Sequence, residues 1–299
     1  MLQHGQGASS LKVFGFQFAP TRHRKPENQA TIEAMLAKAE PPPGSFVVLP
    51  EMFDSSWTFD VDAATEGDSP GWAARIAAKF QIHLQIGFGR RVARAPGATN
   101  ATVIAHPDGR LGPVYEKMHP FGFTEEPRHY AAGERLVLDR VGSFKTAPSI
   151  CYDLRFPELY RHAALAGADL LTVIASWPAP RIAHWRAMLI ARAIENQAFV
   201  IGVNRVGCDP EHEYGGESLV ISPQGEILAG AGADTAVISA EIEPSDASIW
   251  RTTFPALADH RCDLLAPIPE TEFSVERELS EEFSDERESK KGKASTEDD

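Results

Sequence analysis

Continuous apolar runs bounded by glycine and proline recur along this chain and constrain its fold more than any other feature. Segments with these properties predict strands at residues 11–18, 45–50, 82–89, 102–107, 146–152, 169–176 and 199–206. Several contain continuous apolar stretches instead of alternating apolar and polar residues, which is typical of strands covered on both faces. Segments with helical spacing lie between them, at residues 27–40, 71–80, 157–167 and 182–197. The alternation predicts a layered α/β fold.

The segment YGGESLVISPQGEILAGAG alternates in polarity and contains the turn residues Pro223 to Gly225. This pattern predicts a β-hairpin, so the sheet is expected to be at least partly antiparallel. No linker-like stretch interrupts residues 11–265, which are therefore predicted to form a single domain. Residues 266–299 are expected to be an acidic, disordered tail, because residues 271–299 hold 11 acidic and 5 basic residues with few large apolar side chains.

Composition excludes several classes of protein. The net charge of −13 argues against a nucleic-acid partner, because binding phosphates requires a clustered basic surface. No apolar run approaches the roughly 20 residues of a membrane span, and the first residues have no apolar export core. Cys151, Cys208 and Cys262 are widely spaced, which supports neither a disulfide framework nor a zinc site. We therefore expect a cytoplasmic protein with no membrane partner and no metal.

Three polar residues end or follow apolar segments. Glu51 follows VVLP, Lys117 lies in VYEKMHPF, and Cys151 ends TAPSIC. Each has an ordinary explanation alone: a solvated loop glutamate, a surface lysine or a small buried thiol. Together they could act as a catalytic set. Glu51 could be a base, Cys151 a nucleophile, and Lys117 a cation that stabilises both the thiolate and the negative charge on the substrate oxygen. The combination indicates covalent attack on a carbonyl group.

Three motifs in this order, LPEMF at 49–53, YEKMHPF at 115–121 and ICYDLRFPELYR at 150–161, resemble the nitrilase, or carbon-nitrogen hydrolase, superfamily. The resemblance extends over residues 11–265. It implies a four-layer αββα sandwich with mixed sheets, a Glu-Lys-Cys triad formed by Glu51, Lys117 and Cys151, and no cofactor. It also implies a homodimer, with the helices at 157–167 and 182–197 packed across a two-fold axis. The alternative is that these helices are buried within one monomer.

Further segments most resemble the ω-amidases, which hydrolyse monoamides of short dicarboxylic acids. They lie at residues 117–135, 175–197 and 204–207. The resemblance implies hydrolysis of the C–N bond of small linear amides, including keto-dicarboxylic ones, through a cysteine thioester, with release of ammonia. It also implies a second catalytic glutamate, for which alignment of TEEPRHYAAG favours Glu126 over Glu125.

The substrate-binding residues are less constrained. Tyr152 and Trp177 follow strand ends and are expected to line the pocket, although either could be core packing. Arg155 could bind a substrate carboxylate or hold the CYDLRFPE turn through Asp153 or Glu158. Of these two roles we favour the structural one, because five donors suit a fixed network.

Other functions remain open. Within the family, the same four residues serve nitrilases and N-carbamoyl amino acid hydrolases. A catalytically inactive binding module on the same fold is a further alternative. A papain-like hydrolase would need a histidine base and an orienting asparagine, but the candidates lie too close to Cys151 in sequence. These candidates are His162, His184, Asn196 and Asn204. A thiol redox protein would need a resolving cysteine nearby.

Overall fold

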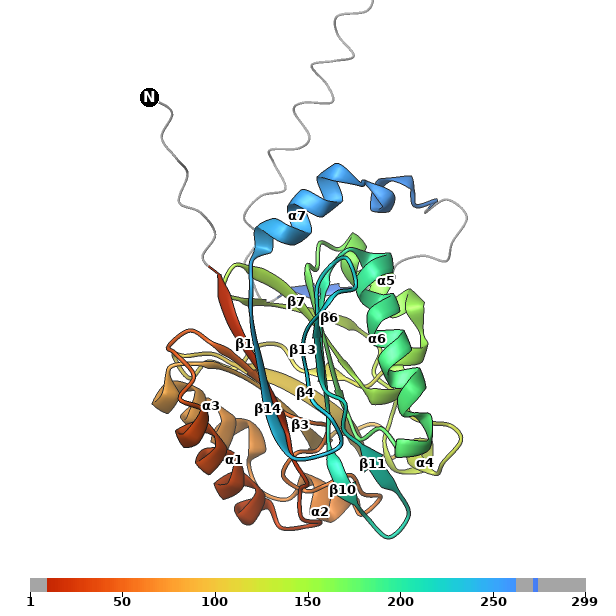
Figure 1. Cartoon of the computed structure of the whole chain (residues 1–299). Coiled ribbons are helices and arrows are strands. Elements are labelled where there is room, and N and C mark those ends of the chain that lie inside the picture. Colours follow the sequence, from red (N-terminus) through yellow and green to blue (C-terminus); the bar gives the residue numbers. More distant parts are fainter. Residues whose placement is uncertain (1–9, 262–270, 274–299) are drawn as a thin grey trace, which may run out of the picture.

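Two β-sheets form the centre of the molecule in the computed structural model, which describes residues 10–261 and 271–273. The first sheet has six strands in the order β14-β1-β2-β3-β4-β5 (Figure 1). Its strands are β1 (Leu11–Gln17), β2 (Phe46–Val48), β3 (His83–Arg91), β4 (Ala98–Ala105), β5 (Tyr115–Glu116) and β14 (Ala236–Ile242). Parallel and antiparallel pairs occur together, as β1 is parallel to β2 and antiparallel to β14.

The second sheet has seven strands in the order β13-β12-β9-β8-β7-β6-β15. Its strands are β6 (Leu136–Val141), β7 (Phe144–Ile150), β8 (Leu170–Ala175), β9 (Phe199–Asn204), β12 (Leu219–Ile221), β13 (Ile227–Gly230) and β15 (Thr271–Phe273). The predicted hairpin is confirmed, since β12 and β13 pair antiparallel around Pro223–Gly225. A separate two-stranded ribbon consists of β10 (Val206–Cys208) and β11 (Glu213–Gly215).

Helices cover the outer face of each sheet. The α-helices are α1 (Lys25–Ala39), α2 (Val61–Thr65), α3 (Ser69–Phe80), α4 (Glu126–His129), α5 (Pro157–Leu165), α6 (Ile182–Asn196) and α7 (Pro244–Thr253). Short 3₁₀ turns occur at η1 (Cys151–Arg155), η2 (Ala179–Arg181) and η3 (Ala256–Asp259). Figure 1 shows α1 and α3 on one side of the two sheets and α5 and α6 on the other.

The alternation of side chains along the strands explains the layers. In β2 and the residue after it, Phe46 and Val48 enter the core between the two sheets, whereas Val47 and Leu49 face the core under α1 and α3. Because both faces of β2 are covered, every position in this strand is apolar. The structure therefore has the predicted four-layer αββα sandwich with mixed sheets.

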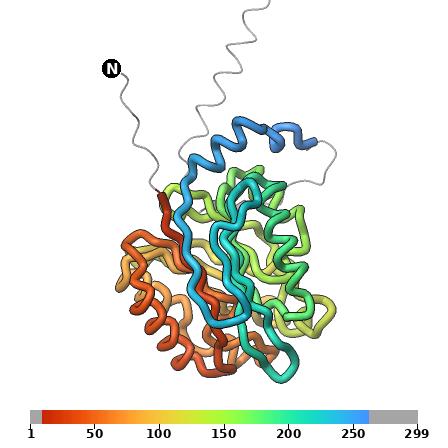
Figure 2. The backbone as a smooth tube through the Cα atoms, in the orientation of Figure 1, coloured from red at the N-terminus to blue at the C-terminus, as the bar shows by residue number. Residues whose placement is uncertain are grey.

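Two segments that are distant in sequence lie side by side at one end of the first sheet. The tube in Figure 2 shows β14, near the C-terminal end of the described chain, running beside β1. All seven residues of β1 pair with β14, from Leu11↔Ile242 to Gln17↔Ala236. This pairing holds the first and last strands of residues 11–242 in the same sheet, as expected of a single domain.

Only a short part of the expected tail is described. Thr271–Phe273 form β15, which pairs in parallel with Leu136–Leu138 of β6. The outer edge of β6 offers backbone groups with which these three residues pair, and the mostly disordered tail stays a prediction. The rest of residues 266–299, and Cys262, lie outside the described residues. Within residues 10–261 and 271–273, no helix has the length and apolar character required to cross a membrane.

Candidate active site

Strand ends from both sheets deliver chemically active side chains to one place. Glu51 lies just beyond the carboxyl end of β2, Lys117 follows β5, and Cys151 follows β7 at the start of η1. Glu126 is the first residue of α4. Glu51, Lys117 and Glu126 are each at most 1% exposed. Burial of three charged groups costs desolvation free energy unless the groups are paired and hydrogen-bonded. Their mutual contacts therefore decide whether the arrangement is stable.

Lys117 joins the two glutamates. Its Nζ lies 2.8 Å from Glu126 Oε1, 2.9 Å from Glu126 Oε2 and 3.2 Å from Glu51 Oε1. Glu125 instead faces solvent and pairs with Arg128, so of the two adjacent glutamates only Glu126 contacts the lysine. The ammonium group has three N–H donors, and these three contacts occupy all of them.

Two further donors hold the carboxylates in place. Asn100, on β4, directs Nδ2 to Glu51 Oε1 at 2.7 Å and to Glu126 Oε1 at 3.2 Å. The backbone N–H of Ser176, just after β8, donates to Glu51 Oε2 at 2.7 Å. No sequence pattern had pointed to Asn100, because it lies among other polar residues, Thr99 and Thr102, in the same strand.

The turn that carries Cys151 is linked directly to the segment that carries Lys117. Cys151 has a φ of +49°, a left-handed conformation that projects the side chain away from the end of β7. Asp153 accepts hydrogen bonds from the backbone N–H of Ile150 at 3.0 Å and from the hydroxyl of Tyr115 at 2.8 Å. It also accepts one from the backbone N–H of His119 at 3.0 Å. Asp153 therefore fixes the cysteine relative to residues on both sides of Lys117.

Electrostatics favour a protonated thiol in the resting site. Burial raises the pKa of Cys151 well above its usual value, and Glu51 and Glu126 raise it further, while Lys117 opposes this. Burial lowers the pKa of Lys117, but the carboxylates of Glu126 and Glu51 outweigh that effect and raise it well above its usual value. Lys117 thus acts in the expected direction, toward the thiolate, but burial and the two carboxylates outweigh it.

A narrow cavity of about 40 Å³ gives access to these groups. Its lining includes Glu51, Lys117, Glu126 and Cys151, together with the expected Tyr152 and Trp177. His212 and Tyr214 from the β10–β11 ribbon also line it, and no sequence pattern had pointed to them. Within the described residues, no group of three or more His, Cys, Asp or Glu side chains could hold a metal ion.

Two arginines lie on the more exposed part of this cavity. The guanidinium of Arg155 lies 5.0 Å from the ring centre of Trp177, and that of Arg181 lies 5.6 Å from the ring centre of Phe121. Neither forms an ion pair with any acidic residue among residues 10–261. The expected link from Arg155 to Asp153 or Glu158 is therefore wrong, because Asp153 is already occupied by Ile150, Tyr115 and His119.

Comparison with known families agrees with this geometry. Residues 16–252 match the family model described as carbon-nitrogen hydrolase. The chain belongs to the carbon-nitrogen hydrolase family. The matched region of this carbon-nitrogen hydrolase begins within β1 and ends within α7, so it includes every residue of the site described above.

Curated relatives of this carbon-nitrogen hydrolase include amidases. It is 33% identical over 252 residues to a 2-oxoglutaramate amidase of Bacillus subtilis, covering 83% of this chain and 96% of the relative. It is 40% identical over 217 residues to the omega-amidase YafV of Escherichia coli K12, covering 71% of this chain and 83% of the relative.

Solved structures share the fold. A CN-hydrolase superfamily protein of Xanthomonas campestris, with an arsenic adduct in its active site, is 30% identical and superposes with a TM-score of 0.80. That comparison covers 86% of this chain and 100% of the other. Nit3 of Saccharomyces cerevisiae, a member of branch 10 of the nitrilase superfamily, is 26% identical with a TM-score of 0.74, covering 82% and 94%.

Proposed function

We propose that this protein is an amidase that hydrolyses the terminal amide of short dicarboxylic or keto-dicarboxylic acid monoamides through a cysteine thioester. One observation carries the proposal: the cavity has a thiol, a lysine and two carboxylates at its buried end and, toward solvent, two arginines that form no ion pair within residues 10–261. A linear substrate with an amide at one end and a carboxylate at the other matches this distribution of charge. The relatives named as 2-oxoglutaramate amidase and omega-amidase support the same substrate class.

Acylation begins when the Cys151 sulfur attacks the amide carbon. Glu51 accepts the thiol proton as the carbon–sulfur bond forms, so a stable thiolate is not required beforehand. Lys117 and the backbone N–H of Tyr152 stabilise the negative charge on the substrate oxygen. Glu51 then passes the proton to the departing nitrogen, the carbon–nitrogen bond breaks, and ammonia leaves a thioester on Cys151.

Deacylation uses the same groups. Glu51 removes a proton from a water molecule that attacks the thioester carbon, and Lys117 again stabilises the oxyanion. The carbon–sulfur bond breaks, the sulfur regains a proton, and the carboxylic acid is released. Glu126 keeps Lys117 oriented throughout, since it occupies two of the three donors of the ammonium group.

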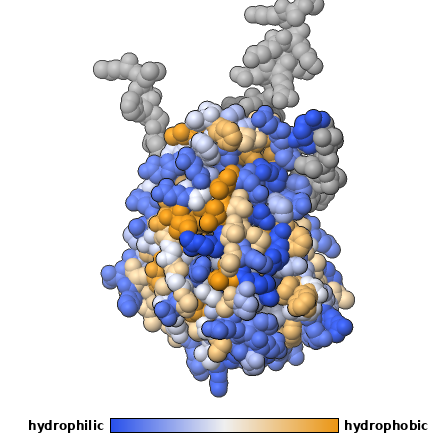
Figure 3. All heavy atoms as spheres, turned by 45° about the vertical axis from the view of Figure 1, so that its right-hand side comes forward, coloured by the Kyte–Doolittle hydropathy of each residue, from blue (hydrophilic) through white to orange (hydrophobic). Residues whose placement is uncertain are grey.

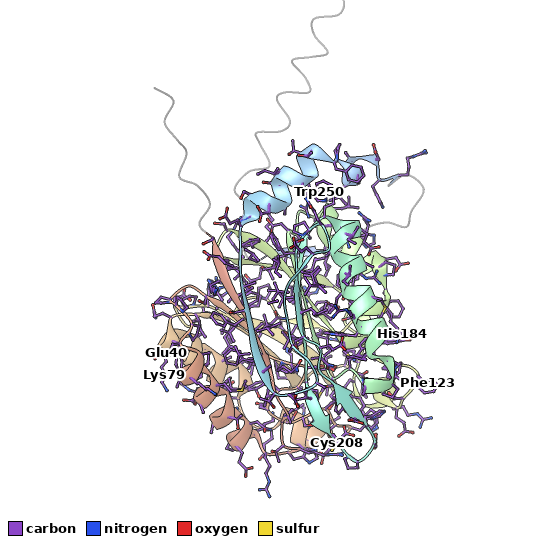
Figure 4. All side chains as sticks on the ribbon, viewed as in Figure 1. Glu40, Lys79, Phe123, His184, Cys208 and Trp250 are labelled. Carbon is purple, nitrogen blue, oxygen red and sulfur yellow. The ribbon has the colours of Figure 1, made fainter. Side chains whose placement is uncertain are left out.

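The experiment that tests this function is a substrate panel scored for ammonia. The panel contains glutaramate, 2-oxoglutaramate, a neutral amide of equal length, the matching nitrile and an N-carbamoyl amino acid. We expect turnover to be fastest with the two carboxylated amides. Cys151→Ala should abolish turnover, whereas Cys208→Ala, at an exposed thiol outside the cavity lining, should not (Figure 4).

Each alternative predicts a different result from the panel. Preference for the nitrile or the carbamoyl compound would contradict the proposed substrate but not the mechanism. Absence of ammonia release from all compounds would favour a binding module. A papain-like mechanism would require activity to depend on a histidine, so loss of activity in His184→Ala but not in Glu51→Gln would refute Glu51 as the base.

The expected homodimer belongs to this proposal as well. Exposed apolar side chains lie on α6 and on or beside α7: Ile194 is 51% exposed, Ile249 62% and Phe254 56%. Figure 3 brings the side of the molecule that carries α6 forward and shows hydrophobic residues gathered on it. A second copy of the chain would cover such a surface. We also place the protein in the cytoplasm, in keeping with the free Cys151 and Cys208.

A further inference from the structure

We infer that Asn100 is a positioning residue that keeps Glu51 and Glu126 ionised side by side, so that Glu51 is available as the base. This inference rests on the proposed function, because it explains how one lysine can serve two buried carboxylates. Neither the family motifs nor the names of the relatives point to this residue.

Asn100 touches all three charged members of the site. Its side-chain amide donates one hydrogen to Glu51 Oε1 at 2.7 Å and the other to Glu126 Oε1 at 3.2 Å. Its backbone carbonyl accepts the N–H of Lys117 at 2.8 Å. One residue on β4 therefore sets the distance between the two carboxylates and anchors the backbone of the lysine that they share.

The orientation of the amide follows from its neighbours. Both groups beside Nδ2 are carboxylate oxygens, which only accept hydrogen bonds, so the NH₂ side must face them. The opposite atom, Asn100 Oδ1, is buried and has no hydrogen-bond partner among the residues that the structure describes. An unpaired buried carbonyl destabilises a fold, and such exceptions call for an explanation. The explanation here is that the donor side is needed at the two carboxylates.

The charges show why a neutral donor is required. The groups in direct contact, two carboxylates and one ammonium, leave one negative charge. The thiol of Cys151, the hydroxyl of Tyr130 and the guanidinium of Arg205 also act on the carboxylates, but Arg205 donates to Ser56 Oγ and to neither glutamate. Lys117 has already committed its three donors. Without Asn100, repulsion between Glu51 and Glu126 would favour protonation of one of them, and a protonated Glu51 cannot accept the thiol proton. The acid limb of the pH-rate profile should then move to higher pH.

The test compares Asn100→Leu with Gln85→Leu. Gln85 is a matched control: it is a fully buried amide on the neighbouring strand β3, its Oε1 also lacks a partner, and its Nε2 binds Thr102 rather than a carboxylate. The pH dependence of kcat/KM is measured with the best carboxylated amide of the panel. Asn100→Leu should move the acid limb upward by about one pH unit or more, whereas Gln85→Leu should leave it in place. An unmoved limb in Asn100→Leu, or an equal shift in both variants, would overturn the inference.

A second measurement requires no turnover. The melting temperature of both variants is followed from pH 5 to pH 8. Because repulsion grows as both glutamates ionise, the loss of stability in Asn100→Leu relative to Gln85→Leu should increase with pH. A constant difference would contradict the role of Asn100 even if the protein proved not to be an amidase. Conversely, inactive wild-type protein with a growing difference would contradict only the proposed function.

A third variant covers the case in which Asn100→Leu does not fold. Asn100→Asp keeps the shape of the side chain and replaces the donor with an acid. At neutral pH it adds a third carboxylate, so it should be less active than wild type there and recover as the pH falls and the new acid takes up a proton. Wild-type pH dependence in Asn100→Asp would equally overturn the inference.

Discussion

At the scale of single residues, the raised pKa of Cys151 affects how readily its thiol reacts with oxidants and alkylating agents. Its pKa is raised by burial and by Glu51 and Glu126, so it retains its proton until a substrate arrives. Oxidation and alkylation require the thiolate and are therefore slow at such a site. In the proposed mechanism, activation of the nucleophile therefore depends on a bound carbonyl group and on Glu51, and not on a permanent negative charge.

The arginines of the cavity lead to a prediction about substrate charge. Arg155→Gln and Arg181→Gln should each reduce kcat/KM for glutaramate by about 10- to 100-fold, because each removes a charge-assisted contact to the carboxylate. Turnover of a neutral amide of equal length should change much less. Steady-state kinetics with both substrates provides the measurement.

A matched arginine controls for the change in total charge. Arg186 lies on α6, is exposed, and is close to Glu217 rather than the cavity. Arg186→Gln should leave both substrates unaffected. Equal losses for charged and neutral amides in the Arg155 and Arg181 variants would show that the arginines support the fold and not the carboxylate.

At the residue scale, the sequence predicted which side chains would lie together where a motif marked the position, and their catalytic roles stay a prediction. Glu51, Lys117, Cys151 and Glu126 lie in recognisable strings, and the structure brings all four to one cavity. Asn100 and Arg181 were missed because their importance depends on tertiary neighbours: the amide faces two carboxylates, and the guanidinium faces a cavity. Neither circumstance leaves a trace in local sequence.

At the scale of elements, β3 passes directly beneath Glu51. A Cβ atom added at Gly87 would lie 2.6 Å from Ile174 Cδ1, 2.8 Å from the backbone nitrogen of Met52 and 2.9 Å from Glu51 Cα. Contacts this short with backbone atoms cannot be relieved by rotating a side chain. Glycine at this position therefore allows the segment that carries the base to lie close to the sheet.

Gly87→Ala should accordingly displace Glu51. We expect kcat to fall by at least about tenfold, since displacements near 1 Å at a catalytic group have effects of this size or larger. Gly232→Ala is the control, because no atom lies within 4 Å of the added Cβ there. Full activity in Gly87→Ala would show that the backbone of residues 51 and 52 can move without affecting catalysis.

Elements were predictable where one physical pattern dominated. The continuous, largely apolar runs at β1, β2, β3, β7, β8 and β9 all appear as strands. In β14, Ile238, Ala240 and Ile242 are buried and alternate with more exposed residues, a period of two that the search for continuous runs overlooked. The ribbon of β10 and β11 contains few apolar residues, so its position beside the cavity could not be predicted.

At the scale of the whole molecule, a chain of hydrogen bonds joins the two sheets at the end opposite the cavity. His83 Nδ1 lies 3.0 Å from His106 Nδ1, and His106 Nε2 lies 3.0 Å from Asp139 Oδ2. Burial lowers the pKa of His83 to about 4, with His106 adding to the effect and Asp139 opposing it. His83 is therefore neutral in the folded protein at pH values where the unfolded chain would bind a proton.

This difference predicts how stability depends on pH. Between about pH 6.5 and pH 4, His83 binds a proton in the unfolded state but not in the folded state. The free energy of unfolding therefore falls as the pH falls through this window. After allowance for solvent screening, the effect is about 2 kcal/mol. Melting temperatures from pH 4 to pH 7 should decline less steeply in His83→Gln than in wild type or in the control His162→Gln. Parallel curves for all three proteins would refute this assignment.

The proposed dimer is also tested on the whole molecule. Ile249→Glu combined with Phe254→Glu should convert the protein to monomers in light scattering after size-exclusion chromatography, because charges cannot be buried in an apolar interface. Leu111→Glu changes an exposed apolar residue outside α6 and α7 and should leave the dimer intact. A wild-type monomer at micromolar concentration would contradict the dimer itself.

The backbone around the site limits how this protein can be improved by engineering. Met52, which follows the base, and Cys151 adopt left-handed φ values of +46° and +49°, where a side chain costs about 1 kcal/mol. Because glycine adopts positive φ values freely, Met52→Gly is the substitution that this strain suggests for raising the melting temperature. Such a change would relieve the strain but remove a fully buried side chain at a larger cost, about 2–5 kcal/mol, and loosen the loop that carries the proposed base, so we expect both thermal stability and turnover to fall.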